Sequence, residues 1–143
     1  MKRLIILLIM LLPLSVMAQS PDVESIVKEY SSKEKCTTIN ISNAMLRSME
    51  VDIDAEYMQV VAVEDEMLAP TFRTQVQELL KECDIIMSVN REGKIVEVYQ
   101  HANQRGEVVD IYILACDEGK SIMMHITGTN LKLNNIGSLM NTL

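Results

Sequence analysis

Apolar residues recur with the period of an α-helix in three stretches of the chain. The first helix is predicted to open at Ser20, with this hydroxyl as its N-cap and Pro21 in its first turn. The second is predicted to begin at Pro70, and the third to follow Asn130. Their apolar faces are Val23, Ile26, Val27 and Tyr30; Phe72, Val76, Leu79 and Leu80; and Leu133, Ile136, Leu139, Met140 and Leu143. Because short isolated helices are marginal in water, we expect these faces to be buried against a sheet.

Alternating and β-branched residues predict six strands. Two of them, Cys36–Ser42 and Glu56–Glu64, precede the second helix, and a short helical turn over Ala44–Met49 lies between them. The other four strands follow that helix at Ile85–Val89, Ile95–Tyr99, Val108–Leu114 and Ile122–Thr127. Gly128 closes the last strand.

Three evenly spaced glycines, Gly93, Gly106 and Gly119, separate the last four strands, and each lies in a polar cluster. Glycine tolerates the positive φ of tight hairpins, so the four strands are predicted to form an antiparallel meander. Helices are predicted before, between and after the strands. The expected fold is therefore α+β, a mainly antiparallel sheet made of the C-terminal meander and two earlier strands. We expect the helices on one face of this sheet and a more open second face.

The first 18 residues are typical of a secretory signal peptide. Lys2 and Arg3 precede the uninterrupted apolar run Leu4–Leu12, and Ala18 ends a segment of small and apolar residues. The run is shorter than the roughly 20 residues that a membrane-spanning helix needs. Gln19, rather than a cysteine, follows the expected cleavage point, which argues against a lipid anchor.

Removal of this segment would leave a single α+β domain over residues 19–143. We expect it to be soluble and exported, periplasmic or extracellular, with no transmembrane segment after cleavage. The chain has 143 residues and a formal charge of −7, and this acidity argues against binding to nucleic acid or to an anionic membrane.

Three cysteines, Cys36, Cys83 and Cys116, would enter an oxidising compartment on export. Two of them can form a disulfide, which would leave the third as a free thiol. The sequence does not decide between this arrangement and three free thiols. No CxxC motif and no Cys–His pair at ligand spacing is present, so we assign no metal and no cofactor.

The two histidines, His101 and His125, are the residues best suited to acid–base chemistry near neutral pH. No Ser/His/Asp pattern and no GxSxG motif accompanies them. We therefore interpret both as surface or rim residues and assign no catalytic residue.

The densest acidic stretches are Glu64-Asp65-Glu66 and the alternating Asp52, Asp54 and Glu56. The turn glycine and distal glutamate of a calcium loop are missing at the required offsets, so a solvated acidic loop is the better interpretation. Carboxylates that converge only in the fold would still allow a small secreted hydrolase.

Eight methionines follow the first 18 residues: Met45, Met49, Met58, Met67, Met87, Met123, Met124 and Met140. Met45 and Met49 are spaced to share a helix face. Methionine can bind Cu(I) in exported proteins or form an adaptable apolar surface. We interpret these side chains as core residues that fill irregular gaps.

The segment from the second helix to the C-terminus has a recognisable pattern. It contains Phe72-Arg73-x-x-Val76-x-x-Leu79-Leu80, then Asp84-Ile85-Ile86-Met87-Ser88-Val89 and Lys94-Ile95-Val96-Glu97-Val98-Tyr99, and ends with Ile126-Thr127-Gly128-x-x-Leu131-x-Leu133-x-x-Ile136-x-x-Leu139. This pattern, together with the signal peptide, resembles the exported family known as domain of unknown function 4252 over about residues 25–143. The resemblance implies an origin in Bacteroidota and a place in a Gram-negative envelope, and it assigns no role to any residue.

From these observations we expect a non-enzymatic exported domain that binds a protein or an apolar ligand in the cell envelope. The alternative is a small secreted hydrolase whose carboxylates converge in the fold. The sequence names no catalytic, cofactor-binding or metal-binding residue for either function.

Overall fold

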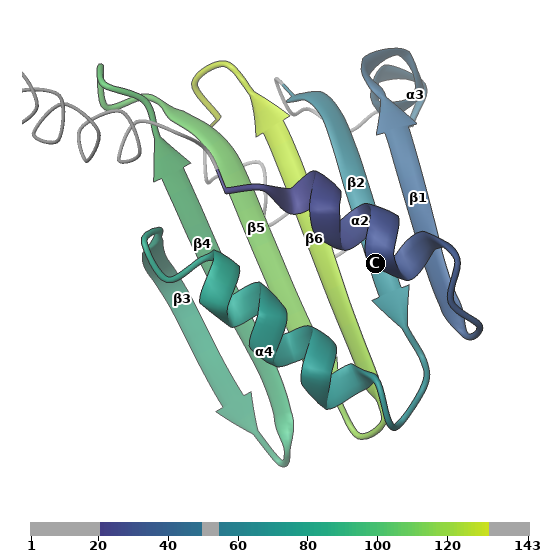
Figure 1. The fold of residues 1–143 in the computed structure, drawn as a ribbon. Coiled ribbons are helices and arrows are strands. Elements are labelled where there is room, and N and C mark those ends of the chain that lie inside the picture. Colours follow the sequence, from purple (N-terminus) through teal and green to yellow (C-terminus); the bar gives the residue numbers. More distant parts are fainter. Residues whose placement is uncertain (1–20, 50–54, 132–143) are drawn as a thin grey trace, which may run out of the picture.

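Six strands form one sheet in which every neighbouring pair runs antiparallel (Figure 1). This computed structural model describes residues 21–49 and 55–131. The strands are β1 (Cys36–Ser42), β2 (Ala55–Val63), β3 (Asp84–Arg91), β4 (Lys94–Ala102), β5 (Val108–Asp117) and β6 (Lys120–Gly128). Their order across the sheet is β1-β2-β6-β5-β4-β3. The predicted α+β class with a mainly antiparallel sheet is confirmed.

The hairpin connections of the meander contain the three spaced glycines. Gly93, Gly106 and Gly119 have φ of +82°, +80° and +70°, a conformation that side chains with a Cβ disfavour. They connect β3 to β4, β4 to β5, and β5 to β6, and each connected pair is antiparallel. The glycines therefore fix the turns that place these four strands side by side, as predicted.

Two helices cross the same face of the sheet (Figure 1). α2 (Val23–Ser31) packs on β1 and β2, and α4 (Ala69–Leu79) packs on β5 and β6. The cap of α2 is Asp22, whose Oδ1 accepts a hydrogen bond from the Ser25 amide, and not Ser20, which lies outside the described residues. The short helix α3 (Asn43–Ser48) follows β1 and is capped by the Ser42 hydroxyl. None of the described helices is long and apolar enough to cross a bilayer.

A first core fills the space between these helices and the sheet, and we call it the helix-side core. Phe72, Val76 and Leu80 of the second predicted stripe are fully buried in it, while Leu79 is partly buried. Its other buried members are Val23, Ile26, Tyr30, Val61, Val63, Ala69, Tyr99, Tyr112, Leu114, Cys116 and Met123. Two of the three predicted helices therefore pack as expected. The third, over residues 133–143, lies outside the described residues, as does the predicted signal peptide, 1–18.

The second face of the sheet has an apolar core of its own, so the expected open face is wrong at its centre. Ile111 and Ile126 are buried there, and Leu46 of α3 and Leu131 join the same cluster. The other buried members are Ala55, Met58, Val98, Ile113 and Met124. The rim of this face is exposed at Ile39, Met87, Val89 and Ile122.

The sulfur-containing residues divide between core and surface. Cys36, Cys83 and Cys116 are all free thiols, with Cys116 buried in the helix-side core and the other two packed beside it. Met58, Met123 and Met124 are buried, as expected for core residues. The core interpretation is wrong for the exposed side chains of Met45, Met49, Met67 and Met87, and Met140 lies outside the described residues. In α3 only Leu46 is buried, which leaves Met45 on the solvent side.

Candidate functional site

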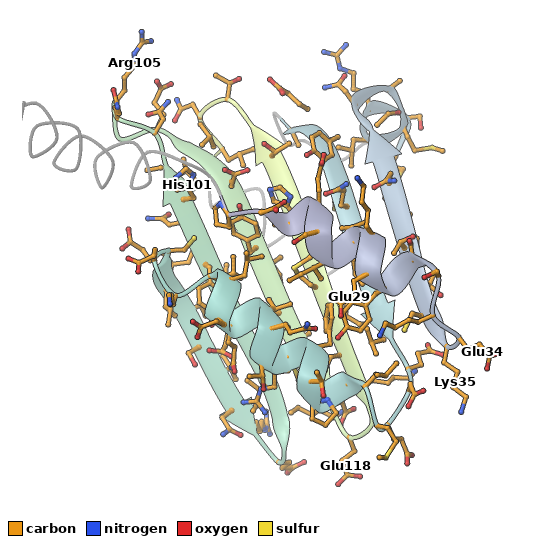
Figure 2. The ribbon with its side chains drawn as sticks, viewed as in Figure 1. Glu29, Glu34, Lys35, His101, Arg105 and Glu118 are labelled. Atoms are coloured by element: carbon orange, nitrogen blue, oxygen red, sulfur yellow. The ribbon has the colours of Figure 1, made fainter. Side chains whose placement is uncertain are left out.

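Three polar side chains meet on the helix-covered face of the sheet. Asp110 of β5 lies between His125 of β6 and His101 of β4, and Figure 2 shows His101 on β4. His125 Nε2 is 2.8 Å from Asp110 Oδ1, and His101 Nδ1 is 3.1 Å from Asp110 Oδ2. Asp110 and His125 are only 4% and 6% exposed. One buried carboxylate is therefore shared by two imidazoles.

The strand register explains why these residues meet. His101 lies directly opposite Asp110 in the β4–β5 pair. His125 lies opposite Tyr112 in the β5–β6 pair, which places it diagonally across from Asp110 on the same face. The three residues are 9 and 15 positions apart in sequence, and only the two hairpins bring them into contact.

The hydrogen bonds determine which nitrogen of each imidazole donates. Burial alone would raise the pKa of Asp110. The hydrogen bond and the electrostatic attraction of His125 act in the opposite direction, as do hydrogen bonds from His101 and Thr127. These interactions outweigh burial, and the pKa is lowered. Asp110 is thus an ionised carboxylate, which can only accept. His125 donates from Nε2, and its Nδ1 is a lone-pair acceptor when the ring is neutral.

Two tyrosines hold the His125 ring in place. The Tyr112 ring stacks on it, with centroids 4.5 Å apart and an interplanar angle of 10°. The Tyr57 ring approaches edge-on at 6.1 Å. Burial and the nearby Asp110 carboxylate raise the pKa of both phenols, so both remain neutral. The imidazole is therefore held in one orientation, in contact with two aromatic rings.

Several polar atoms in this region are buried without a partner. In the part of the chain that the structure describes, they include Gln59 Oε1, Tyr112 Oη and His125 Nδ1. These three residues form one row across β2, β6 and β5, because Gln59 and Tyr112 are both register partners of His125. A buried polar group without a hydrogen bond costs about 1–3 kcal/mol. Such a row is a place where a bound molecule can supply the missing partners.

A cleft of about 610 Å³ opens onto this row. Its walls are the first turn of α2 and the inner sides of β2, β5 and β6. The lining residues are Pro21, Asp22, Val23, Glu24, Tyr57, Gln59, Asp110, His125 and Thr127. Among these described residues, three are acids and none is lysine or arginine. The volume lies within the roughly 300–1,000 Å³ typical of small-molecule sites.

The interpretation of the histidines as surface or rim residues is wrong for His125, which is buried, while His101 is partly buried. The sequence contains one signal that points to the cluster. Asp110 is a charged residue within the apolar strand Val108–Leu114, where a buried charge requires a partner.

The described residues of the acidic stretches singled out in the sequence do not line this cleft. Glu64 and Glu66 are exposed, and Glu64 pairs with Lys120 at 3.5 Å, as a solvated acidic loop requires. Glu56 is also exposed, and Asp52 and Asp54 lie outside the described residues. Within residues 21–49 and 55–131, no three histidine, cysteine or acidic side chains are placed to hold a metal ion.

Comparison with known proteins gives a family and nothing more specific. No curated protein and no solved structure matches the chain. The family model described as "Domain of unknown function (DUF4252)" matches residues 30–139, which spans β1 to β6 and both histidines. The resemblance found in the helix and meander motifs is thus confirmed for the family itself. This 143-residue chain belongs to the DUF4252 family.

Proposed function

We propose that this chain is an exported binding domain whose cleft beneath the first turn of α2 holds a small polar ligand. The export part of the proposal is supported by residues 1–18, where a basic start, an apolar run and a small residue before the cleavage point follow the signal-peptide pattern. The place of action is then the periplasm or the cell exterior, and binding, not catalysis, is the role.

The observation that supports binding most strongly is the unpaired Nδ1 of His125. The imidazole is 6% exposed and lines the cleft. Its orientation is fixed by Asp110 on one side and Tyr112 on the other. A fixed acceptor in a concave site is the arrangement that orients a small ligand.

The lining of the cleft favours a polar ligand over the apolar or protein partner expected from the sequence. Carboxylates of Asp22, Glu24 and Asp110 share the lining with the amide of Gln59. An apolar molecule would leave Gln59 Oε1 and His125 Nδ1 without hydrogen bonds, at a cost in free energy.

One observation favours the alternative of a small secreted hydrolase, because three carboxylates do converge on one cleft. A glycoside hydrolase requires one of its two carboxyl groups to be protonated at the working pH, which demands a raised pKa. The pKa of Asp110 is lowered instead. The buried acid therefore suits ligand orientation better than proton donation.

The proposal predicts a specific response to small ligands. Protein recovered from cells that carry the full gene would be screened against polar fragments by ¹H–¹⁵N NMR. We expect fragments to shift the amides of residues that line the cleft. His125→Phe keeps the ring stacked on Tyr112 but removes the acceptor nitrogen, and it should abolish these shifts. His101→Phe also removes one hydrogen bond to Asp110, yet His101 does not line the cleft, so this variant should retain them.

The same sample reports on export through its intact mass. We expect a chain that begins at Gln19. A mass that includes residues 1–18, or an added acyl chain, would overturn the export part of the proposal. Fragment shifts that map elsewhere, or that are equal in the two histidine variants, would overturn the binding part.

A further inference from the structure

We infer that the ligand of this cleft is a small organic amine bound as its ammonium form. This inference rests on the proposed function and adds the chemical class of the ligand. It follows from the charge of the lining, from the unpaired acceptors on the floor of the cleft, and from the apolar surface beside them.

The charge of the lining favours a cation. Asp22 caps α2, Glu24 lies in its first turn, and Asp110 lies on the floor, while the described residues of the lining include no lysine or arginine. The N-terminus of a helix by itself attracts anions, with the equivalent of about half a positive charge. Here the Asp22 carboxylate already accepts the Ser25 amide, and Glu24 adds a second negative charge. An anionic ligand would therefore meet repulsion from three carboxylates.

The unpaired atoms on the floor favour a ligand that donates hydrogen bonds. Gln59 Oε1 is an acceptor, and so is His125 Nδ1 in the neutral ring, because the one ring proton then lies on Nε2, which donates to Asp110. Both are buried and both residues line the cleft. An alkylammonium group carries three N–H donors and a positive charge, so it can donate to the unpaired acceptors and is attracted by the carboxylates of the lining. A hydroxyl group would donate one hydrogen bond and gain nothing from the charge.

The remaining walls accommodate a short carbon chain. Val23 and Tyr57 line the cleft together with Pro21. An ammonium close to the Tyr57 ring would also be attracted by its π electrons. A linear alkylamine thus fits the lining better than a small inorganic cation, which would use none of this apolar surface.

The test compares three probes of equal length and different head group: n-butylammonium chloride, sodium butyrate and butan-1-ol. Each is titrated into the purified protein at constant ionic strength, followed by ¹H–¹⁵N NMR. We expect saturable shifts at Tyr57, Gln59 and Thr127 with n-butylammonium, and at least about tenfold weaker binding of the other two, the factor that one charge-assisted hydrogen bond supplies.

Two charge variants separate the cleft from the general acidity of the chain. Glu24→Gln removes a carboxylate from the lining and should weaken n-butylammonium binding severalfold. Glu34→Gln removes the same charge in the loop between α2 and β1, as Figure 2 shows, and should leave the affinity unchanged. Equal weakening by both variants would mean diffuse attraction to an acidic surface and would overturn the inference.

The possible failures are distinguishable. Binding of butyrate or butan-1-ol in the cleft without n-butylammonium would overturn the ligand class and leave the proposed function standing. No shift in the cleft with any of the three probes would also overturn the ligand class, and the fragment screen then decides the proposed function separately.

Discussion

Replacing Asp110 with asparagine is expected to lower the free energy of unfolding by about 3–5 kcal/mol, the usual cost of removing one partner from a buried charged pair. Asp110 accepts from both His125 and His101 while 4% exposed. An asparagine presents one oxygen and one NH₂ group, so one imidazole N–H would face another donor. Urea unfolding of the two proteins at neutral pH measures the difference.

The ionised state of Asp110 also predicts how the stability difference between the wild-type protein and the Asp110→Asn variant depends on pH. The folded-state pKa of Asp110 lies below its ordinary value, so its contribution is fully present above the unfolded pKa of about 3.9. It is lost as the pH falls through the folded pKa. The stability gap between the wild-type protein and the Asp110→Asn variant should therefore stay constant from neutral pH to about pH 5 and shrink below about pH 4.

The matched control is Asp117→Asn, at the end of the same strand. Its side chain is half exposed and lies 3.9 Å from the Lys94 ammonium, so the loss should stay within about 0.5 kcal/mol. Similar losses for the two variants, or a gap that widens in acid, would contradict the assignment of Asp110 as a buried, ionised acceptor.

Replacing Phe72 with alanine is expected to cost about 3–5 kcal/mol, the range for truncation of a fully buried aromatic residue. Phe72 has no exposed surface, and its ring meets the Tyr30 ring edge-on at a centroid distance of 4.9 Å. This contact joins α4 to α2 above the sheet, and an alanine would leave a cavity in the helix-side core. The loss is a large share of the roughly 5–15 kcal/mol that stabilise a domain.

Thermal and urea unfolding would measure this loss, with Met67→Ala as the control. Met67 lies in the loop before α4 and is 84% exposed, so its truncation should change stability by less than about 0.5 kcal/mol. Equal unfolding midpoints for Phe72→Ala and the wild-type protein would mean that α4 is not docked on the sheet.

Local patterns in the sequence were sufficient to predict most elements of the fold. The strand Cys36–Ser42 is observed with the predicted bounds, and α4 begins one residue before Pro70. The positive φ of Gly93, Gly106 and Gly119 follows from turn chemistry that acts over a few residues. These features are predictable because their causes lie close together in the chain.

The sheet order is not predictable in this way. β2 pairs with β6, more than 50 residues later, and no local pattern marks this contact. That pairing places Gln59 beside His125, and the β5–β6 hairpin places Tyr112 on its other side. The cleft therefore depends on long-range register, which is why the sequence alone predicts surface or rim positions for both histidines.

The most direct test of the central claim is the tautomer of the neutral His125 ring, read from the ¹⁵N chemical shifts of its two nitrogens. The claim is that Asp110 holds this ring with an acceptor nitrogen at the floor of the cleft. We expect Nε2 to carry the proton and Nδ1 to show the shift of a bare lone pair. A proton on Nδ1, or the averaged shifts of a freely exchanging imidazole, would contradict the claim.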